Sequence, residues 1–274
     1  MGTYLSDQQI ERIRRELTIV FSLPYATDLF GTAWEQILAD AKAGVWTGKR
    51  DNRPNPDIYV PLPGGTRKNF SVKCEHLKAR PGRRVGKVNG PSRADAAGFR
   101  GDKMDFIIAR PKADELLGGG ETVANLDATA LGSLVLRYYN EQIVQRYEWH
   151  ALSFVAPVVF TEEPDRIEFV YWEEEPPTIY NTADYWWQDT GRATGSNRNI
   201  AGYPHTVARG TQPLPAAKFR WTSGGKQFYV LDDIPPNADV WTVTKVKLTR
   251  DDIWEALQRK LAAAKRITSQ PPQT

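Results

Sequence analysis

The sequence predicts an α/β protein in which a mixed central β-sheet is flanked by helices, with a loop-rich C-terminal half that also contains strands. Two observations favour this class: apolar residues recur at helical spacing at both ends of the chain, and short β-type runs fill the middle. The chain of 274 residues has no internal repeat and suits a single compact domain. We expect a helical N-terminal part and the core sheet within residues 1–150. The core continues through residues 151–267, and residues 268–274 form a disordered tail.

Helices are predicted first near the N-terminus. Residues 6–21 begin at Ser6, a good N-cap residue, and end before Pro24. A second helix, residues 27–43, ends at Gly44.

Two further helices are expected later in the chain. Residues 129–150 carry a broad apolar stripe, and residues 249–265 close the ordered chain. Thr249 and Asp252 resemble a capping box at the start of the closing helix.

Strands are predicted from short runs of β-branched and aromatic residues. They occupy residues 58–60, 69–75, 105–109, 154–160, 166–172, 218–221, 227–231 and 240–247. A short Pro/Gly-rich loop joins the first two runs, which predicts an antiparallel pair.

Composition excludes several classes of protein. The single cysteine, Cys74, rules out a disulfide framework and thiolate zinc sites, and three scattered histidines disfavour an all-histidine metal site. No apolar stretch approaches the roughly 20 residues of a membrane span, and no signal peptide begins the chain. We therefore expect a cytoplasmic protein without a membrane partner, whose metal ions would bind oxygen ligands.

Positive charge is segregated along the chain. Residues 67–110 contain 12 Lys and Arg against four acids, and residues 190–231 contain no Asp or Glu at all. The net charge is only +3, so acids are concentrated elsewhere. This segregation indicates a positive face that can attract a polyanion such as nucleic acid.

One segment carries candidate catalytic chemistry. Asp57 is followed after thirteen residues by Ser71, and then by Lys73 and Glu75 at alternate positions. Alternate residues of a strand share a face, so the last three point the same way, with Asp57 beside them on the paired strand. Carboxylates beside a lysine suit Mg²⁺, whose bound water can attack a phosphate. The alternative is that Asp57 caps a turn and the others are ordinary residues of a half-buried strand.

This pattern resembles the PD-(D/E)xK nuclease superfamily, most familiar as type II restriction endonucleases. Glu35, on the helix before the core sheet, matches an acid that the superfamily often places there. Ser71 departs from the pattern, because the position usually holds Asp or Glu. Glu75 or Glu35 could supply the missing carboxylate.

The resemblance implies a Mg²⁺-dependent enzyme that cuts double-stranded DNA at a short, GC-containing site and leaves 5′-phosphates. Asp57 with Glu75, Glu35 or both would bind the metal, Lys73 would position the attacking water, and Ser71 would contribute a hydroxyl. A homodimer and a cognate DNA methyltransferase that protects the same site are the expected partners.

DNA contacts are expected from basic and amide side chains. Phosphate contacts are assigned to Arg80, Arg83, Arg84 and Lys87. Base or groove contacts are assigned to Arg192, Ser196, Asn197, Arg198, Asn199, Arg209, Arg220, Ser223, Lys226 and Gln227. The aromatic residues around Trp186 could stack on bases, but the cluster is more typical of core packing.

Two other functions remain open: a structure-specific or repair nuclease with the same centre, and a non-catalytic DNA-binding protein in which Ser71 marks a decayed site. A glycosidase is disfavoured, because the consecutive acids at 173–175 alternate between the faces of a strand and make no facing pair.

Overall fold

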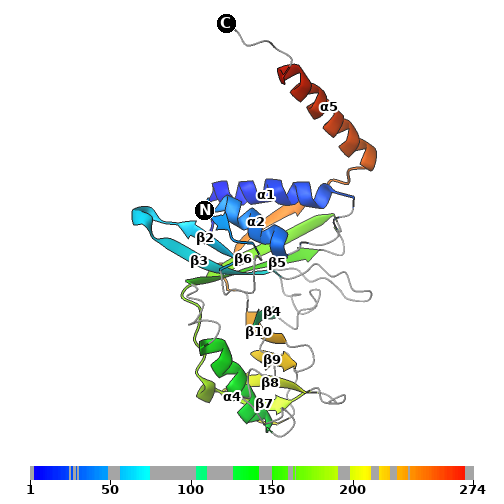
Figure 1. The fold of residues 1–274 in the computed structure, drawn as a ribbon. Coiled ribbons are helices and arrows are strands. Elements are labelled where there is room, and N and C mark those ends of the chain that lie inside the picture. The colour runs from blue at the N-terminus through cyan, green and yellow to red at the C-terminus, as the bar shows by residue number, and fades with distance from the viewer. Residues whose placement is uncertain are drawn as a thin grey trace.

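Two β-sheets and the helices that pack against them form the fold of this computed structural model (Figure 1). The structure describes residues 3–24, 26, 29, 31–48, 56–74, 103–109, 126–141, 150–159, 163, 165–190, 198–210, 216–222, 227–233 and 235–268. The expected α/β class with a mixed sheet flanked by helices is confirmed. A second sheet was not foreseen.

The first sheet is mixed. Its six strands lie in the order β1 (Val45–Trp46), β2 (Ile58–Pro61), β3 (Arg67–Cys74), β5 (Ala151–Val159), β6 (Arg166–Glu174) and β11 (Asp239–Thr244). Strands β3 and β5 run parallel, and the other described pairs are antiparallel. The predicted antiparallel pair is β2 and β3, which a 3₁₀ turn at Pro63–Gly65 connects. The sheet thus combines strands from residues 1–150 with strands from residues 151–267, the two parts into which the sequence analysis divides the chain.

Helices α1 (Asp7–Ser22) and α2 (Gly31–Ala41) cover one face of the first sheet (Figure 1). Ser6 caps α1 as predicted, in a capping box with Gln9. Apolar residues of both helices pack against Phe70 and Val72 of β3 in one buried cluster. The helix face of β3 is therefore apolar.

The second sheet is antiparallel. Its strands lie in the order β4 (Lys103–Ala109), β10 (Gln227–Asp233), β9 (Phe219–Thr222), β8 (Asn199–Pro204) and β7 (Tyr185–Asp189), with a 3₁₀ turn at Thr182–Asp184 before β7. Helix α4 (Ala128–Tyr138) packs on it. A Cβ atom on Gly132 of α4 would lie 2.0 Å from the Trp187 ring of β7, so only glycine permits this close approach.

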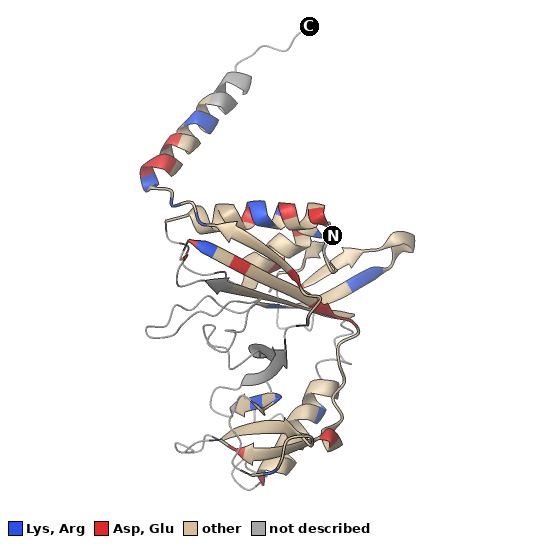
Figure 2. Cartoon of the chain, turned by 180° about the vertical axis from the view of Figure 1, so that it is seen from behind, with Lys and Arg blue, Asp and Glu red and all other residues tan. Residues whose placement is uncertain are grey.

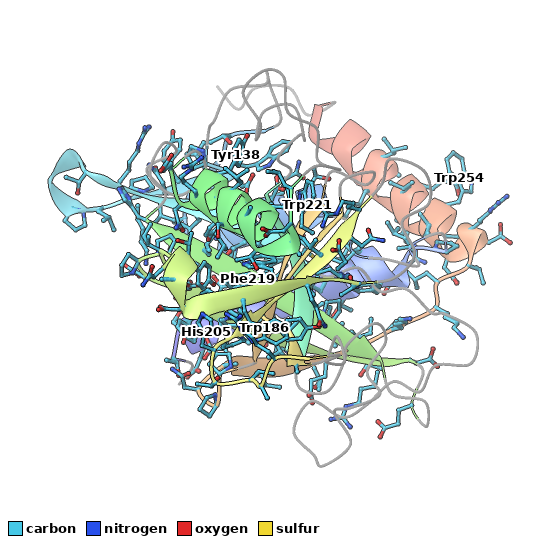
Figure 3. All side chains as sticks on the ribbon, turned by 90° about the horizontal axis from the view of Figure 1, so that it is seen from below. Tyr138, Trp186, His205, Phe219, Trp221 and Trp254 are labelled. Atoms are coloured by element: carbon cyan, nitrogen blue, oxygen red, sulfur yellow. The ribbon has the colours of Figure 1, made fainter. Side chains whose placement is uncertain are left out.

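One of the buried hydrophobic clusters joins the two sheets. Leu152 and Phe154 of β5 lie in the same buried cluster as Trp187, Phe219 and Trp221 of the second sheet. The tryptophans at 186 and 187 are both about 5% exposed, so they are core residues, as the favoured interpretation had it. Figure 3 shows Phe219 and Trp221 among the strands of the second sheet, beside α4.

Several boundaries differ from the sequence prediction. Strands β1, β7 and β8 are absent from the sequence prediction. All three are short, and Gly202 interrupts the β-type pattern of β8. Residues 105–109 belong to strand β4, which lies in the second sheet rather than in the first. Helix α4 ends at Tyr138, well before the expected end, and passes into a π-helical turn at 139–141. Residues 142–149 lie outside the described part.

Helix α5 (Arg250–Thr268) extends away from the rest of the chain (Figure 1). The predicted capping box is present: the Asp252 Oδ2 atom accepts hydrogen bonds from the Thr249 hydroxyl at 2.7 Å and from the Thr249 N–H at 2.8 Å. Thr268 belongs to the helix, contrary to the expected tail, and residues 269–274 lie outside the described part. Within the described residues, no helix is both long and apolar enough to cross a membrane.

The buried carboxylate of Asp239 joins the N-terminal segment to β11. Its oxygens accept hydrogen bonds from the backbone N–H groups of Thr3, Tyr4 (2.9 Å) and Leu5 (2.7 Å).

Hydrogen bonds to a charged acceptor are strong, so Asp239→Asn should lower the free energy of unfolding by about 1–3 kcal/mol in urea titrations. The matched change Glu11→Gln, at an exposed ion pair with Arg14, should cost about 0.5 kcal/mol or less. Equal losses in the two variants would contradict this role for Asp239.

The capping box of α5 predicts a pH effect. The Thr249 hydroxyl, followed by the Thr249 N–H, lowers the pKa of Asp252 from its ordinary value of 3.8. A lowered pKa means that the contribution to helix stability is present above the ordinary value and is lost as the pH falls through the lowered one. NMR titration should therefore show Asp252 titrating below a typical Asp, with the first turn of α5 fraying in acid. Thr249→Val should return the pKa toward 3.8, and an ordinary value in the unmodified protein would contradict the cap.

Candidate active site at the β2–β3 edge

Asp57 lies immediately before β2, where β3 continues past the end of its partner strand. Its N–H donates a hydrogen bond to the Phe70 carbonyl at 2.9 Å. Its carboxylate Oδ2 atom accepts a hydrogen bond from the Val72 N–H at 2.7 Å. The carboxylate therefore accepts the hydrogen bond of a β3 backbone N–H group that has no partner strand opposite it in the β2–β3 ladder.

Ser71 and Lys73 lie on the face of β3 opposite the helices. Phe70 and Val72 between them belong to the cluster that packs under α1 and α2. The Ser71 hydroxyl lies 3.3 Å from Asp57 Oδ2, and Lys73 Nζ lies 2.5 Å from Ser71 Oγ. Lys73 Nζ is also 4.0 Å from Asp57 Oδ2. The structure thus brings together three of the five predicted catalytic residues.

These three side chains form a directed hydrogen-bond chain. The Lys73 ammonium can only donate, so Ser71 Oγ accepts from it. The single hydroxyl proton of Ser71 is then donated to the Asp57 carboxylate. Charged groups at both ends strengthen the two hydrogen bonds and hold the ammonium in place. Ser71 consequently connects the two charges and adds no negative charge of its own.

Exposure increases from the serine to the carboxylate. Ser71 is 1% exposed, whereas the side chains of Lys73 and Asp57 are 14% and 30% exposed. A buried serine is poorly placed as a nucleophile toward a macromolecule. Asp57 and Lys73 are the members of this group that a substrate or a hydrated cation could reach.

Glu35 is held elsewhere. It is a buried residue of α2, and its Oε2 atom accepts a hydrogen bond from the Trp46 indole N–H at 2.9 Å. That contact connects the helix to β1, whereas Ser71 and Lys73 lie on the other face of the sheet. Glu75 lies outside the described residues. Within the described ranges, no three His, Cys, Asp or Glu side chains form a cluster that could hold a metal ion.

Asn69 belongs to the same polar row and was missed by the sequence analysis. It precedes Ser71 by two residues, is buried, and its N–H donates to His150 Nδ1 at 3.1 Å. The period of two that placed Ser71 and Lys73 on one face also places Asn69 there. That period was the signal that could have identified it.

Most of the predicted DNA contacts cannot be placed. Arg80, Arg83, Arg84, Lys87, Arg192, Ser196, Asn197, Ser223 and Lys226 lie outside the described residues, and Gln227 is placed only as the first residue of β10, opposite Thr222. Arg209 is exposed, and Arg220 is half-buried on β9. Asn199 begins β8, and its Oδ1 atom is buried without a hydrogen-bond partner in the described part.

Arg198 has a structural role. Its Nη2 atom lies 2.8 and 2.9 Å from the two carboxylate oxygens of Asp189, and its Nη1 atom donates to the Leu126 carbonyl. The side chain is only 13% exposed. It joins the β7–β8 hairpin to the start of α4, which favours an internal ion pair over the expected base contact.

The contacts of Asp57 predict how two substitutions differ. Asp57→Ala removes the acceptor of the Val72 N–H and one end of the Lys73–Ser71 chain, so it should lower the free energy of unfolding by about 1–3 kcal/mol. Asp57→Asn keeps an acceptor oxygen in place and should lose less than half of that. Chemical denaturation of the two variants measures the difference. Equal losses would show that the Val72 contact contributes little.

Comparisons with protein-family models, with curated proteins and with solved structures return no match for this chain. The resemblance to the PD-(D/E)xK superfamily therefore depends on the residues themselves: the spacing of Asp57, Ser71 and Lys73, and the position of Ser71 and Lys73 on β3 with Asp57 just before β2.

Proposed function

We propose that this protein is a Mg²⁺-dependent endonuclease that cuts double-stranded DNA at specific sites, in the manner of type II restriction endonucleases. The observation that carries the proposal is the convergence of Asp57, Ser71 and Lys73 at the end of the β2–β3 pair. The carboxylate and the ammonium lie 4.0 Å apart, and both are partly exposed. In phosphodiester hydrolysis a carboxylate can bind the metal ion, and an ammonium can stabilise the negative charge that develops on the phosphate.

The described part of the site offers one carboxylate to a Mg²⁺ ion. The described hydrogen bonds to the Asp57 carboxylate use Oδ2, which leaves Oδ1 as a candidate ligand atom. Proteins often bind this cation through one or two carboxylates and leave several water ligands in place. Asp57 would hold the metal with Glu75, because Glu35 contacts Trp46 on the other face of the sheet. Once bound, the cation supplies Lewis-acid stabilisation of the phosphate and a water of lowered pKa.

Lys73 would orient the attacking water and balance negative charge as it develops on the phosphate. Its own orientation depends on Ser71, since the 2.5 Å hydrogen bond directs the ammonium along the sheet face toward Asp57. A serine in place of the usual acid thus retains the position of the lysine but removes one candidate metal ligand. Hydrolysis by this arrangement would leave a 5′-phosphate and a 3′-hydroxyl.

The charge distribution supports DNA as the substrate. The 42 residues from 190 to 231 contain no acid, and 12 cations lie within residues 67–110, which begin in β3 itself. Positive charge flanking a phosphodiester-cleaving centre would supply affinity for the phosphate backbone. A structure-specific or repair nuclease would share the centre and the charge but lack base recognition.

A second candidate is a non-catalytic DNA-binding protein. It is favoured by one observation: Ser71 stands at the position where the superfamily usually has an acid. In that case the Asp57–Ser71–Lys73 chain would be a structural remnant.

A cleavage assay separates these functions. Unmethylated phage DNA is incubated with the protein in Mg²⁺ or in EDTA, and the products are separated on a gel and their ends sequenced. Discrete bands that require Mg²⁺ support a restriction endonuclease, and a Mg²⁺-dependent smear indicates a nuclease without base recognition. Intact DNA that still shifts in a binding assay supports the second candidate.

Two variants test the residues in that assay. Asp57→Asn and Lys73→Met should each reduce cleavage by about 100-fold or more, while DNA binding in EDTA is retained. The matched controls Asp165→Asn and Lys247→Met alter an exposed ion pair of the same charges and should cut at the rate of the unmodified protein. Undiminished cleavage by Asp57→Asn would refute the proposed site.

A further inference from the structure

Helix α5 exposes an apolar stripe. Trp254, Leu257 and Leu261 are 57%, 48% and 57% exposed. Their spacing of three and then four residues places them along one face of the helix, in the pattern of a coiled-coil seam. Figure 3 shows Trp254 on α5, well separated from the aromatic core of the second sheet.

A helix with this arrangement lacks the packing that normally stabilises helices. In proteins most of the stability of a helix comes from burial of an apolar face rather than from helix propensity. Helix α5 extends away from the two sheets (Figure 1) and exposes Trp254, Leu257 and Leu261. Val246, in the segment that leads to the helix, is also 51% exposed and adds to the apolar surface.

Charge is divided between the two halves of α5. The first half contains three acids, Asp251, Asp252 and Glu255, beside one base, Arg250 (Figure 2). The second half contains no acid and four bases, Arg259, Lys260, Lys265 and Arg266. A parallel pair of such helices would place acid beside acid and base beside base. An antiparallel pair places the acidic half of each helix beside the basic half of the other, so the helix is complementary to a second copy of itself.

We propose that α5 forms an antiparallel pair with α5 of a second copy of this chain, with Trp254, Leu257 and Leu261 at the contact. A two-fold axis near the middle of the helix would make the contact isologous, since the same surface is used by both chains. The inference depends only on α5 and is independent of the proposed nuclease activity. Because each helix contributes only a few large apolar side chains, the dimer should be reversible and concentration-dependent.

Sedimentation velocity over a range of protein concentrations tests the proposal. The unmodified protein should shift from monomer to dimer as its concentration rises. Leu257→Gln combined with Leu261→Gln should weaken the dimer at least about tenfold, without loss of fold because both side chains are exposed. A control variant, Ile19→Gln, changes an exposed apolar residue of α1 and should dimerise normally. A monomer at every concentration, or a dimer unaffected by the double variant, would overturn the proposal.

Charge variants test the complementarity. Arg259→Glu with Lys260→Glu places acids in both halves of the helix, and Asp251→Lys with Asp252→Lys places bases in both halves. Each protein alone should dimerise more weakly than the unmodified chain, and a mixture of the two should recover association. No recovery on mixing would refute the electrostatic part of the argument.

Cross-linking tests the orientation. Gln258→Cys lies near the centre of the helix, so an antiparallel pair brings the two introduced thiols together and allows a disulfide. Asp251→Cys lies near one end, and its two copies are then far apart. Efficient cross-linking through both positions would instead indicate a parallel pair. The unmodified chain, whose one cysteine is Cys74, gives the background level.

Discussion

The alternation of side chains along β3, which places apolar residues on one face and polar residues on the other, is the constraint on which the remaining structure depends. Phe70 and Val72 face α1 and α2 and require burial, whereas Asn69, Ser71 and Lys73 face the other way. The side-chain period of a strand is two, so a shift of one residue would exchange the two faces. The register that buries the core is therefore also the register that assembles the candidate site.

The start of β2 gives the site its position. Strand β3 continues beyond its partner, and the Val72 N–H at that point is satisfied by the Asp57 carboxylate rather than by a backbone carbonyl. The hydrogen bond from the Val72 N–H also fixes the position of the Asp57 carboxylate. Its orientation is then fixed before any substrate binds, which is the preorganisation that electrostatic catalysis requires.

The shared core brings separate sequence segments to the same face of the first sheet. Leu152 and Phe154, on the face that carries Ser71 and Lys73, pack with aromatic residues from the second sheet, and β4 of that sheet comes close to β3. Pairing between segments also changes the electrostatics. Residues 190–231 lack acids in the sequence, yet the β7–β8 hairpin brings Asp189 against Arg198 and neutralises that cation. A sequence segment without acids is therefore less positive in the folded protein than its composition implies.

The sequence by itself determined the local elements and the local part of the site. The capping boxes at Ser6 and Thr249, the β2–β3 pair and the common face of Ser71 and Lys73 follow from spacing and propensity, which act over a few residues. Only the tertiary structure decided that β4 belongs to a second sheet, that Glu35 contacts Trp46, and that Arg198 is held by Asp189. These outcomes depend on which distant segments pack together. That packing follows from the burial of aromatic side chains along the whole chain, and a local pattern does not encode it.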